Sequence, residues 1–372
     1  FLNKNMKTKK LIIFMPSIEG GGADKNLFII TNYLVEKFDN IKLITSSSKY
    51  KKIFNKKINF LSPRISVWSK FGRNLKNIIS LIILIKTLIK NRNSIVLSFQ
   101  ANLYAILICK ILSIKIITRS NSFPGDWTKS NFKKFLFKTI YKMADERIVN
   151  SIGSKKRFLK HYNLSSVCIY NPLNLKEIIK LSKIKKKNLF NKKASLKLIS
   201  VGRLSEEKDH LTFLKSILYL KSKINLSALI VGEGLLKKNL LEFIKKNKLN
   251  EIVKLTGYKK NPYPYIKQAN FLVLTSLHEG LPNILLEAIA LKKFVVSSNC
   301  ETGPKEILIN GKAGALFKVK SYLDLSNKIL FFHKNKKIRD KKVQFGYSKI
   351  NRFDSDKNLK NYLKIINILS NS

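Results

Sequence analysis

Hydrophobic residues in the first half of the chain fall into short runs separated by segments of helical periodicity. The runs are rich in Ile, Leu and Val, which is typical of buried strands. They lie at 10–17, 41–46, 94–99, 114–120 and 146–151. After the first run, Leu27, Ile30 and Leu34 recur at the spacing of one helix face. Residues 74–90 and 102–112 predict two further helices.

The same alternation restarts after a break at about 172–196. The break contains a proline and many lysines, and it predicts a connection between two domains. Helices are predicted at 208–221 and 234–247, and the segment from about 350 to 372 is again helical. The predicted strands of this half are 196–202, 227–232, 253–257, 271–276 and 294–299.

Strands that alternate with helices pair in parallel, so each half predicts a doubly wound α/β sheet. We expect two Rossmann-like domains that face a cleft. The N-terminal domain covers 1–175 and the C-terminal domain covers 190–345. Ligands of such sheets bind outside the carboxyl ends of the strands, so the loops that follow the strands are where chemistry is expected.

The charge is strongly positive, with 73 Lys and Arg against 22 Asp and Glu and a net charge of +51. Such a charge favours anionic partners: nucleic acid, an acidic membrane surface or phosphorylated substrates. The excess is nearly all lysine, in a chain also rich in Asn and Ile, which is typical of an AT-rich genome. The hydrophobic fraction of 45% excludes a disordered chain.

The three cysteines, Cys109, Cys168 and Cys300, have no CxxC spacing. They therefore predict neither a disulfide framework nor a zinc site, and their use fits the cytoplasm. The most apolar stretches, 78–85 and 103–108, are shorter than the roughly 20 residues that span a bilayer. We expect a cytoplasmic protein that can rest on the inner face of the cell membrane.

The first candidate site is the glycine loop Gly20-Gly21-Gly22, between a strand and a helix. Glycines let a phosphate approach the backbone, and the helix N-terminus offers N–H groups and a positive dipole. A tight turn without a ligand is the other interpretation. The spacing is not GxGxxG, so no nicotinamide site is predicted, and no GxxxxGK[ST] motif is present.

The second candidate follows the strand that ends at Gly202. Arg203 and Lys208 project from the loop and the helix start beyond it. Two fixed cations at the mouth of a cleft can bind a diphosphate and neutralise its charge as it leaves. The alternative is a pair of solvated surface cations in a very basic chain.

The third candidate is LHEGLPNILLEAIA at 277–290, directly after an apolar strand. A helix that starts near Pro282 places Glu279 in the loop and Glu287 inside the helix. One carboxylate can then meet a sugar hydroxyl and the other a ribose diol. The helix N-terminus is expected to turn backbone N–H groups towards phosphate, at Asn283, Ile284 and Leu285.

Taken in order, these segments resemble family 4 of the retaining glycosyltransferases, which has the GT-B fold. The matching features are GGGADK, VGRL with Lys208, the GEG at 232–234, TGY at 256–258 and EGLPNxLLEA at 279–288. NCETGPKEIL at 299–308 also resembles a segment of members that act in surface-polysaccharide assembly. The helix at about 350–372 resembles the family's C-terminal helix, which returns to the first domain.

The resemblance implies roles for the candidate residues. Arg203 and Lys208 would stabilise the departing nucleotide diphosphate, Glu279 would contact the donor sugar, and Glu287 the ribose. Further nucleotide-sugar contacts are implied at Gly21, Gly22, Gly202, Gly234 and Gly280. The family is metal-independent, so no metal and no cofactor are expected. The Asp-x-Asp at 354–356 lies far from any nucleotide loop and is interpreted as chance.

The acceptor side is less well marked. Many family members place a His or Glu after the strand that corresponds to 114–120, where this chain has Arg119 and Asn121. These two residues are the acceptor-side candidates, and His278 beside Glu279 is interpreted as a rim or core histidine. The implied donor is a UDP-linked hexose or N-acetylhexosamine, and the implied acceptor a saccharide or a polyprenyl-linked saccharide.

Two other functions are weighed against the transferase, and a membrane contact accompanies it. A nucleic-acid-binding protein would carry a basic stripe with interleaved aromatics, whereas lysine is spread over this whole chain, so no nucleic acid is expected. A phosphorylase-like enzyme of similar fold is harder to separate, and a hydrolase would need two carboxylates flanking the scissile bond. An anionic membrane could meet helix 74–90 together with Lys49, Lys51, Lys52, Lys56 and Lys57.

Overall fold

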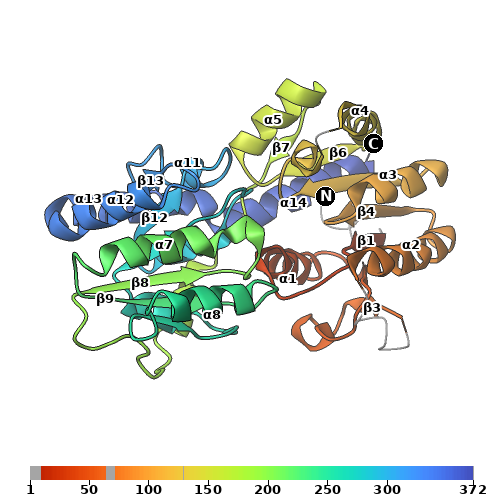
Figure 1. The fold of residues 1–372 in the computed structure, drawn as a ribbon. Coiled ribbons are helices and arrows are strands. Elements are labelled where there is room, and N and C mark those ends of the chain that lie inside the picture. Colours follow the sequence, from red (N-terminus) through yellow and green to blue (C-terminus); the bar gives the residue numbers. More distant parts are fainter. Residues whose placement is uncertain (1–9, 64–71, 129, 372) are drawn as a thin grey trace. The chain divides into compact units, whose positions relative to one another are not determined.

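The computed structural model describes residues 10–63, 72–128 and 130–371, which divide into two compact units. Unit 1 comprises the described residues up to Pro172 and those from Asp356 onward, and unit 2 comprises Leu173–Ser355. Each unit is an α/β body built on its own sheet (Figure 1). Within the described residues, no helix combines the length and the apolar character that a bilayer crossing requires.

Unit 1 is built on a seven-stranded sheet in the order β3-β2-β1-β4-β5-β6-β7, in which all neighbours are parallel. The order reverses between β1 and β4, so the loops after these two strands meet at the topological switch point. The strands are β1 (Lys10–Phe14), β2 (Asn40–Ile44), β3 (Asn59–Leu61), β4 (Ser94–Ser98), β5 (Lys115–Ser120), β6 (Glu146–Val149) and β7 (Val167–Cys168).

Helices cover both faces of this sheet. Side chains alternate along a strand, so in β1 Leu11 and Ile13 join one hydrophobic cluster and Ile12 and Phe14 the other. The first cluster is covered by α1 (Gly22–Leu34) and α14 (Ser355–Asn371). The second is covered by α2 (Arg73–Ile89), α3 (Asn102–Ile111), α4 (Asn131–Lys142) and α5 (Ile152–Tyr162).

Unit 2 has a six-stranded parallel sheet in the order β10-β9-β8-β11-β12-β13, with its switch point between β8 and β11. Its strands are β8 (Leu196–Val201), β9 (Leu226–Val231), β10 (Val253–Leu255), β11 (Phe271–Leu274), β12 (Phe294–Ser298) and β13 (Ala315–Phe317). Its helices are α6 (Leu175–Ser182), α7 (His210–Leu220), α8 (Lys237–Lys246), α9 (Tyr263–Gln268), α10 (Asn283–Ala290), α11 (Pro304–Ile307), α12 (Tyr322–Lys334) and α13 (Lys336–Ser348).

The segment at 172–196, expected to be only a connection, contains a helix that belongs to unit 2. α6 packs on α9 and α10, and its Ile178 is 2% exposed. The side chain of Asn174 caps this helix by accepting the backbone N–H of Glu177 at 3.0 Å. The expectation of a plain connection is therefore corrected over 175–182. The many lysines of this segment obscured the apolar face of one short helix.

Candidate functional site

The switch point of unit 2 brings together the loops after β8 and β11. These strands pair directly, with Phe271 opposite Leu198 and Leu272 opposite Ile199. The loop after β8 carries Arg203 and continues into the short 3₁₀ helix Glu206–Lys208. The loop after β11 carries Glu279, which lies before α10 as expected from the sequence. The parallel sheet thus places both candidate segments at one edge.

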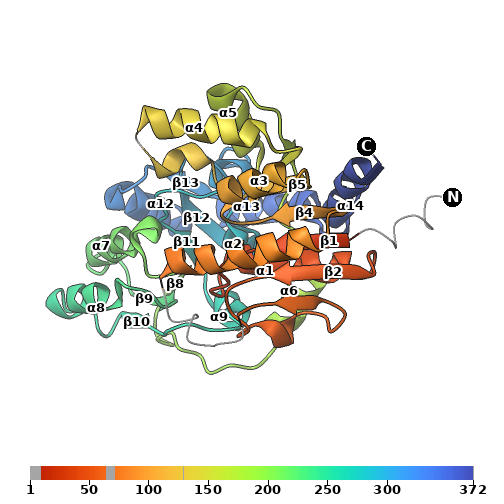
Figure 2. The ribbon, with the colours of Figure 1, turned by 90° about the vertical axis from the view of Figure 1, so that its right-hand side faces the viewer.

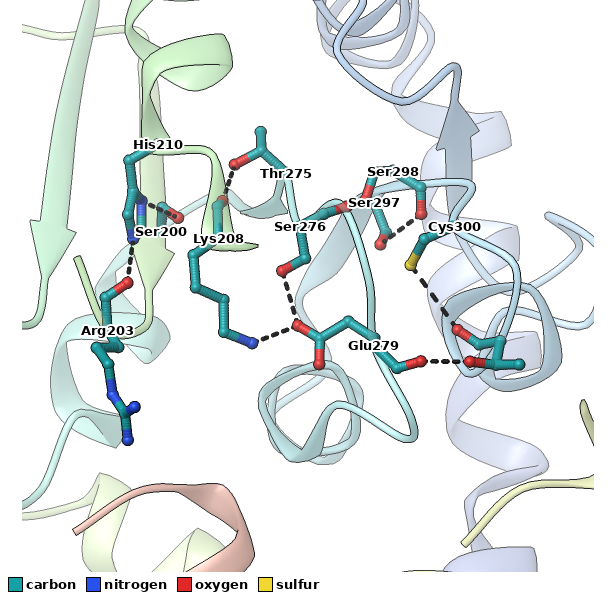
Figure 3. A network of polar contacts seen from close by, with 11 residues as sticks. Ser200, Arg203, Lys208, His210, Thr275, Ser276, Glu279, Ser297, Ser298 and Cys300 are labelled. Atoms are coloured by element: carbon teal, nitrogen blue, oxygen red, sulfur yellow. Dashed lines mark hydrogen bonds and ion pairs between the residues drawn. The ribbon is translucent and has the colours of Figure 1, made fainter. Parts of the chain in front are cut away.

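Lys208 and Glu279 form an ion pair at this edge (Figure 3). The Lys208 side chain is 26% exposed and the Glu279 side chain 10%. The hydroxyl of Ser276 donates to the same carboxylate oxygen, Oε1, at 2.7 Å. Because both donors hold one oxygen, the carboxylate fixes the position of the lysine ammonium between the two loops.

The backbones of the two loops are also tied to each other. The hydroxyl of Thr275 donates to the carbonyl of Lys208 at 2.8 Å, and the N–H of Leu277 donates to the carbonyl of Glu207 at 2.8 Å. These bonds hold Lys208 over the end of β11 independently of its side chain. The ammonium is therefore preorganised, which is what electrostatic stabilisation of a leaving group requires.

The segment 298–308 supports the Glu279 loop through hydrogen bonds and close packing. The hydroxyl of Thr302 donates to the carbonyl of Glu279, and Ser298 Oγ donates to the carbonyl of Ser276 at 2.6 Å. Gly303, at φ +82°, packs so closely that a Cβ there would lie 2.2 Å from the carbonyl oxygen of Gly280. These contacts explain the presence of Thr302 and Gly303 in the CETGP segment, because both residues shape the loop that carries Glu279.

We predict that Gly303→Ala lowers both stability and activity, whereas Gly311→Ala lowers stability only. Both glycines have positive φ, +82° and +86°, so each alanine costs about 1–2 kcal/mol in the backbone. A Cβ at Gly311 meets nothing within 4 Å, but one at Gly303 must displace the Gly280 loop. Urea denaturation and turnover of both variants provide the check; equal activity in the two would contradict this role of Gly303.

The Arg203 loop rests on the loop after β9. A Cβ at Gly234 would lie 2.3 Å from the carbonyl oxygen of Leu204, and one at Gly232 would lie 1.8 Å from that of Gly202. The N–H of Leu204 donates to the carbonyl of Glu233 at 2.9 Å. Gly234 therefore lies under the Arg203 loop and supports its backbone. Its direct contact with a nucleotide sugar stays a prediction, as does that of Gly202.

His210 holds the same loop from inside the unit. It is 3% exposed, its Nε2 lies 3.3 Å from the Arg203 carbonyl, and its Nδ1 lies 3.3 Å from Ser200 Oγ (Figure 3). A carbonyl can only accept, so Nε2 carries the proton and Nδ1 accepts from the serine hydroxyl. Burial lowers the pKa of His210 to about 4, although the bond to the Arg203 carbonyl acts in the opposite direction. The ring is therefore neutral at physiological pH.

This pKa shift predicts a pH-dependent stability. Between about pH 6.5 and pH 4, the unfolded chain protonates His210 and the folded chain does not, so stability is lost as the pH falls through that window. The full loss is about 3 kcal/mol. His210→Gln keeps one donor and one acceptor but has no charge to gain. Between pH 7 and 4.5, we expect the wild type to lose about 2–3 kcal/mol more than this variant in urea denaturation; parallel losses would contradict it.

Glu287 lies on α10 and is 6% exposed. The hydroxyl of Tyr263, on α9, donates to its Oε1 at 3.2 Å. At the start of α10, the N–H of Leu285 already donates to the carbonyl of Pro282 at 3.1 Å. The expected contact of the Leu285 N–H with phosphate stays a prediction. The contacts of Glu287, Gly280, Asn283 and Ile284 with a nucleotide sugar stay predictions.

In unit 1, the glycine loop is organised by a buried carboxylate. Asp24 is 4% exposed, and its Oδ2 accepts the N–H groups of Glu19 and Gly21, each at 2.8 Å. Burial raises the pKa of Asp24 although these N–H groups act in the opposite direction. The N–H of Gly21 thus donates to Asp24, and its expected contact with a phosphate stays a prediction. The contribution of Gly22 stays a prediction.

The acceptor-side candidate Arg119 is fully buried. Its Nε donates to the hydroxyl of Tyr362 on α14 at 2.7 Å, and its Nη2 donates to Asn171 Oδ1 at 2.6 Å. Its Nη1 donates to Asn121 Oδ1. Arg119 therefore joins β5 to α14 inside unit 1 and exposes no surface to an acceptor. This burial contradicts the expected contact of Arg119 with an acceptor. Asn121 Oδ1 accepts from the same guanidinium, and a contact of Asn121 with an acceptor stays a prediction.

Sequence reasoning missed several residues that shape the site: Ser200, His210, Thr275, Ser276, Thr302 and Asp24. They are small or buried polar residues at strand ends, in loops and in the first turns of helices, where a single sequence does not separate them from ordinary surface residues. The signal for Ser276 and Thr275 was their position directly after an apolar strand. His278, interpreted as a rim or core histidine, is exposed.

Comparisons with known proteins identify the part of the chain that carries this site. Residues 182–352 match the family model of the glycosyl transferases group 1. The group 1 glycosyltransferase segment thus includes Arg203, Lys208, Glu279 and Glu287, and it lies within unit 2.

Several curated proteins are similar to parts of the chain, among them the following two. An uncharacterized glycosyltransferase of Methanocaldococcus jannaschii is 38% identical over 181 residues, which are 46% of this chain and 44% of that protein. The second relative is N-acetylgalactosamine-N,N'-diacetylbacillosaminyl-diphospho-undecaprenol 4-alpha-N-acetylgalactosaminyltransferase of Campylobacter jejuni. It is 29% identical over 249 residues, 64% of this chain and 66% of that protein. The chain thus matches less than two thirds of the length of either relative.

The likeness to solved structures extends over both units. Anabaena HepE, solved in complex with UDP and glucose, has a TM-score of 0.79 and 16% sequence identity. The match covers 96% of this chain and 99% of that one. The fold class expected from the sequence, two parallel-sheet α/β units of the GT-B type, is confirmed. Across the described residues, no group of three or more His, Cys, Asp or Glu side chains could hold a metal ion.

Proposed function

We propose that the protein is a retaining, metal-independent hexosyltransferase of glycosyltransferase family 4. It transfers a hexose or N-acetylhexosamine from a UDP-sugar to a saccharide or a polyprenyl-linked saccharide, on the cytoplasmic side of cell-surface polysaccharide synthesis. The observation that carries the proposal is the Lys208–Glu279 pair at the switch point of unit 2, inside the group 1 segment. The name of the Campylobacter jejuni relative and the UDP bound to HepE support the acceptor and donor classes.

Each residue has a defined part in this proposal. The ammonium of Lys208 and the guanidinium of Arg203 stabilise the two phosphates as the bond from the sugar to the diphosphate breaks. Glu279 orients Lys208 through Oε1, which leaves its second oxygen for a donor-sugar hydroxyl. The leaving phosphate accepts the acceptor proton on the same face of the sugar, so no separate base is required.

The test is nucleotide release from a panel of UDP- and GDP-linked hexoses and N-acetylhexosamines, with a polyprenyl-diphosphate-linked saccharide as acceptor. We expect one UDP-sugar to be turned over and the product to keep the anomeric configuration of the donor, read by NMR. Release should persist in EDTA, because side-chain cations supply the charge. Complete loss in EDTA that magnesium reverses would contradict metal independence.

A parallel thermal-shift series separates the remaining alternatives. UDP should raise the Tm, whereas an oligonucleotide should not do so at physiological salt. Phosphate-dependent release of a sugar 1-phosphate from an oligosaccharide, without any nucleotide-sugar turnover, would favour the phosphorylase-like function and overturn the transferase.

A further inference from the structure

The outer face of unit 1 formed by α2, α3, α4 and α5 exposes large apolar side chains. Phe132 and Phe135 on α4 are 74% and 66% exposed, Ile111 on α3 is 81% exposed, and Leu159 on α5 is 58% exposed. All four helices bury their inner sides in the same hydrophobic cluster, so these side chains point away from one face of the sheet. Figure 2 shows α2, α3 and α4 side by side, with α5 next to α4. We call this surface the outer helical face.

α2 adds a continuous apolar stripe to this face. Ile78, Ile82, Ile85 and Ile89 are all exposed, by 38% to 54%. Their spacing of four, three and four residues places them on one side of the helix. The opposite side of α2 is buried, as Leu84 shows. A helix that is apolar on its outer side as well as its inner side indicates a second apolar environment.

The charge of the outer helical face has a single sign. The sequences of α2, α3, α4 and α5 contain no Asp or Glu, although each contains Lys. On α4, Lys133, Lys138 and Lys142 are exposed beside the phenylalanines. The acid that follows α4 along the chain, Asp145, is paired with Lys110 of α3 at 2.7 Å. The face therefore alternates cations with apolar groups and carries no exposed acid from its helices.

A pocket of about 350 Å³ lies between α4 and α5 on this face. Its walls include the cationic side chains Lys134, Lys138 and Arg157, and Phe123 contributes an aromatic wall. The Arg157 guanidinium lies over the Phe123 ring, 4.7 Å from its centroid. Cations that converge above an aromatic surface suit a phosphate headgroup, because the charge is matched and the alkyl part meets the ring.

We propose that the outer helical face docks on an anionic bilayer leaflet, with Phe132, Phe135 and the α2 isoleucines in the interfacial region and the lysines at headgroup phosphates. Peripheral membrane-binding surfaces combine aromatic and aliphatic side chains with interleaved lysines. A second copy of the chain is a poorer occupant, since a symmetric contact would bring the same cations together. The inference does not depend on the proposed sugar transfer.

This surface differs from the one expected from the sequence. α2 belongs to it, but the lysines at 49–57 do not. Their segment packs on α1 at the other face of the sheet, where Phe28 contacts Tyr50 and Phe54 with ring centroids 6.2 and 4.8 Å apart. The periodicity of 74–90 predicted a helix but not that both of its long sides are apolar and that one of them is exposed.

The test is flotation of the full chain with vesicles of phosphatidylcholine alone or with 30–40% phosphatidylglycerol, in the absence of any donor. We expect binding only to the anionic vesicles, with a steep loss as salt rises. F132S/F135S and K133E/K138E should each lower the vesicle affinity at least tenfold. The phenylalanines supply buried apolar area at the interface, and each basic residue near an anionic surface contributes about a fivefold factor. K245E/K246E on α8 and Phe331→Ser on α12 change exposed residues of unit 2 in the same way and should bind normally.

Three outcomes would overturn the proposal. One is no binding of the wild type to anionic vesicles at low salt. The second is unchanged binding by both outer-face variants. The third is a stable dimer of the wild type in sedimentation that F132S/F135S abolishes, which would assign the face to a second copy. The exposed positions make loss of folding unexpected, and circular dichroism melting of every variant verifies it.

Discussion

Replacing Arg203 with alanine should lower kcat about a hundredfold or more while leaving the Tm of the protein within a degree or two. The side chain is exposed, so its removal leaves no cavity in the core. Its guanidinium is proposed to stabilise the diphosphate that leaves, and the loss of one preorganised contact of this kind costs about 2.7–4 kcal/mol of barrier. Steady-state nucleotide release with the accepted donor measures the effect.

Arg92→Ala is the matched control for this prediction. It removes an exposed arginine from the turn before β4 in unit 1 and changes the net charge equally. Arg203→Lys should recover part of the activity, since it keeps the charge but not the bidentate geometry. Near-normal turnover by Arg203→Ala, or an equal loss in Arg92→Ala, would remove Arg203 from the mechanism.

Glu279 and Lys208 should behave as one unit in a double-mutant cycle. We expect Glu279→Ala and Lys208→Ala each to lower kcat by about 10² to 10³. The kcat of the double variant should be no lower than that of the less active single variant. The reason is that Glu279 acts partly by fixing the Lys208 ammonium, so the second change removes an interaction that is already lost. Turnover of the four proteins gives the coupling directly.

Glu233 and Lys237 provide the comparison pair. Their carboxylate and ammonium lie 2.9 Å apart, but both side chains are about half exposed. Such a surface pair contributes at most about 1 kcal/mol to stability, so Glu233→Gln should leave both Tm and turnover nearly unchanged. Additive losses for Glu279→Ala and Lys208→Ala would mean that the two side chains act separately, against the geometry in Figure 3.

The fold could be predicted largely from periodicity. Buried strands such as β4 and β9 are continuous apolar runs, and a strand–helix alternation leaves few topologies. The strands β3 and β7 were not predicted, because two or three residues at a sheet edge carry no periodic signal. The helices α4 and α5 were not predicted for a different reason. Their lysines and exposed phenylalanines obscure the apolar periodicity of the few buried positions, such as Ile140 and Phe158.

The site could be predicted only where its chemistry is carried by charge. Glu279 and Lys208 stand out in sequence because a carboxylate and a cation after apolar strands indicate a ligand. The residues that position them do not stand out, because Ser276 and Thr302 act through single hydroxyls and His210 through its burial. Arg119 was the opposite case, since a residue that looks like a surface cation is buried among neutral acceptors of unit 1.

The position of α14 in unit 1 decides the order in which the protein can be built on a ribosome. Leu359, Tyr362 and Ile366 of α14 complete the same core as β1 and α1, and the Arg119–Tyr362 bond joins residues 243 positions apart. Unit 2 is one continuous segment and can fold while α14 is still being synthesised. Unit 1 cannot close its core until then. Its nascent form therefore exposes an apolar face throughout the translation of unit 2, and chaperones are expected to bind at that stage.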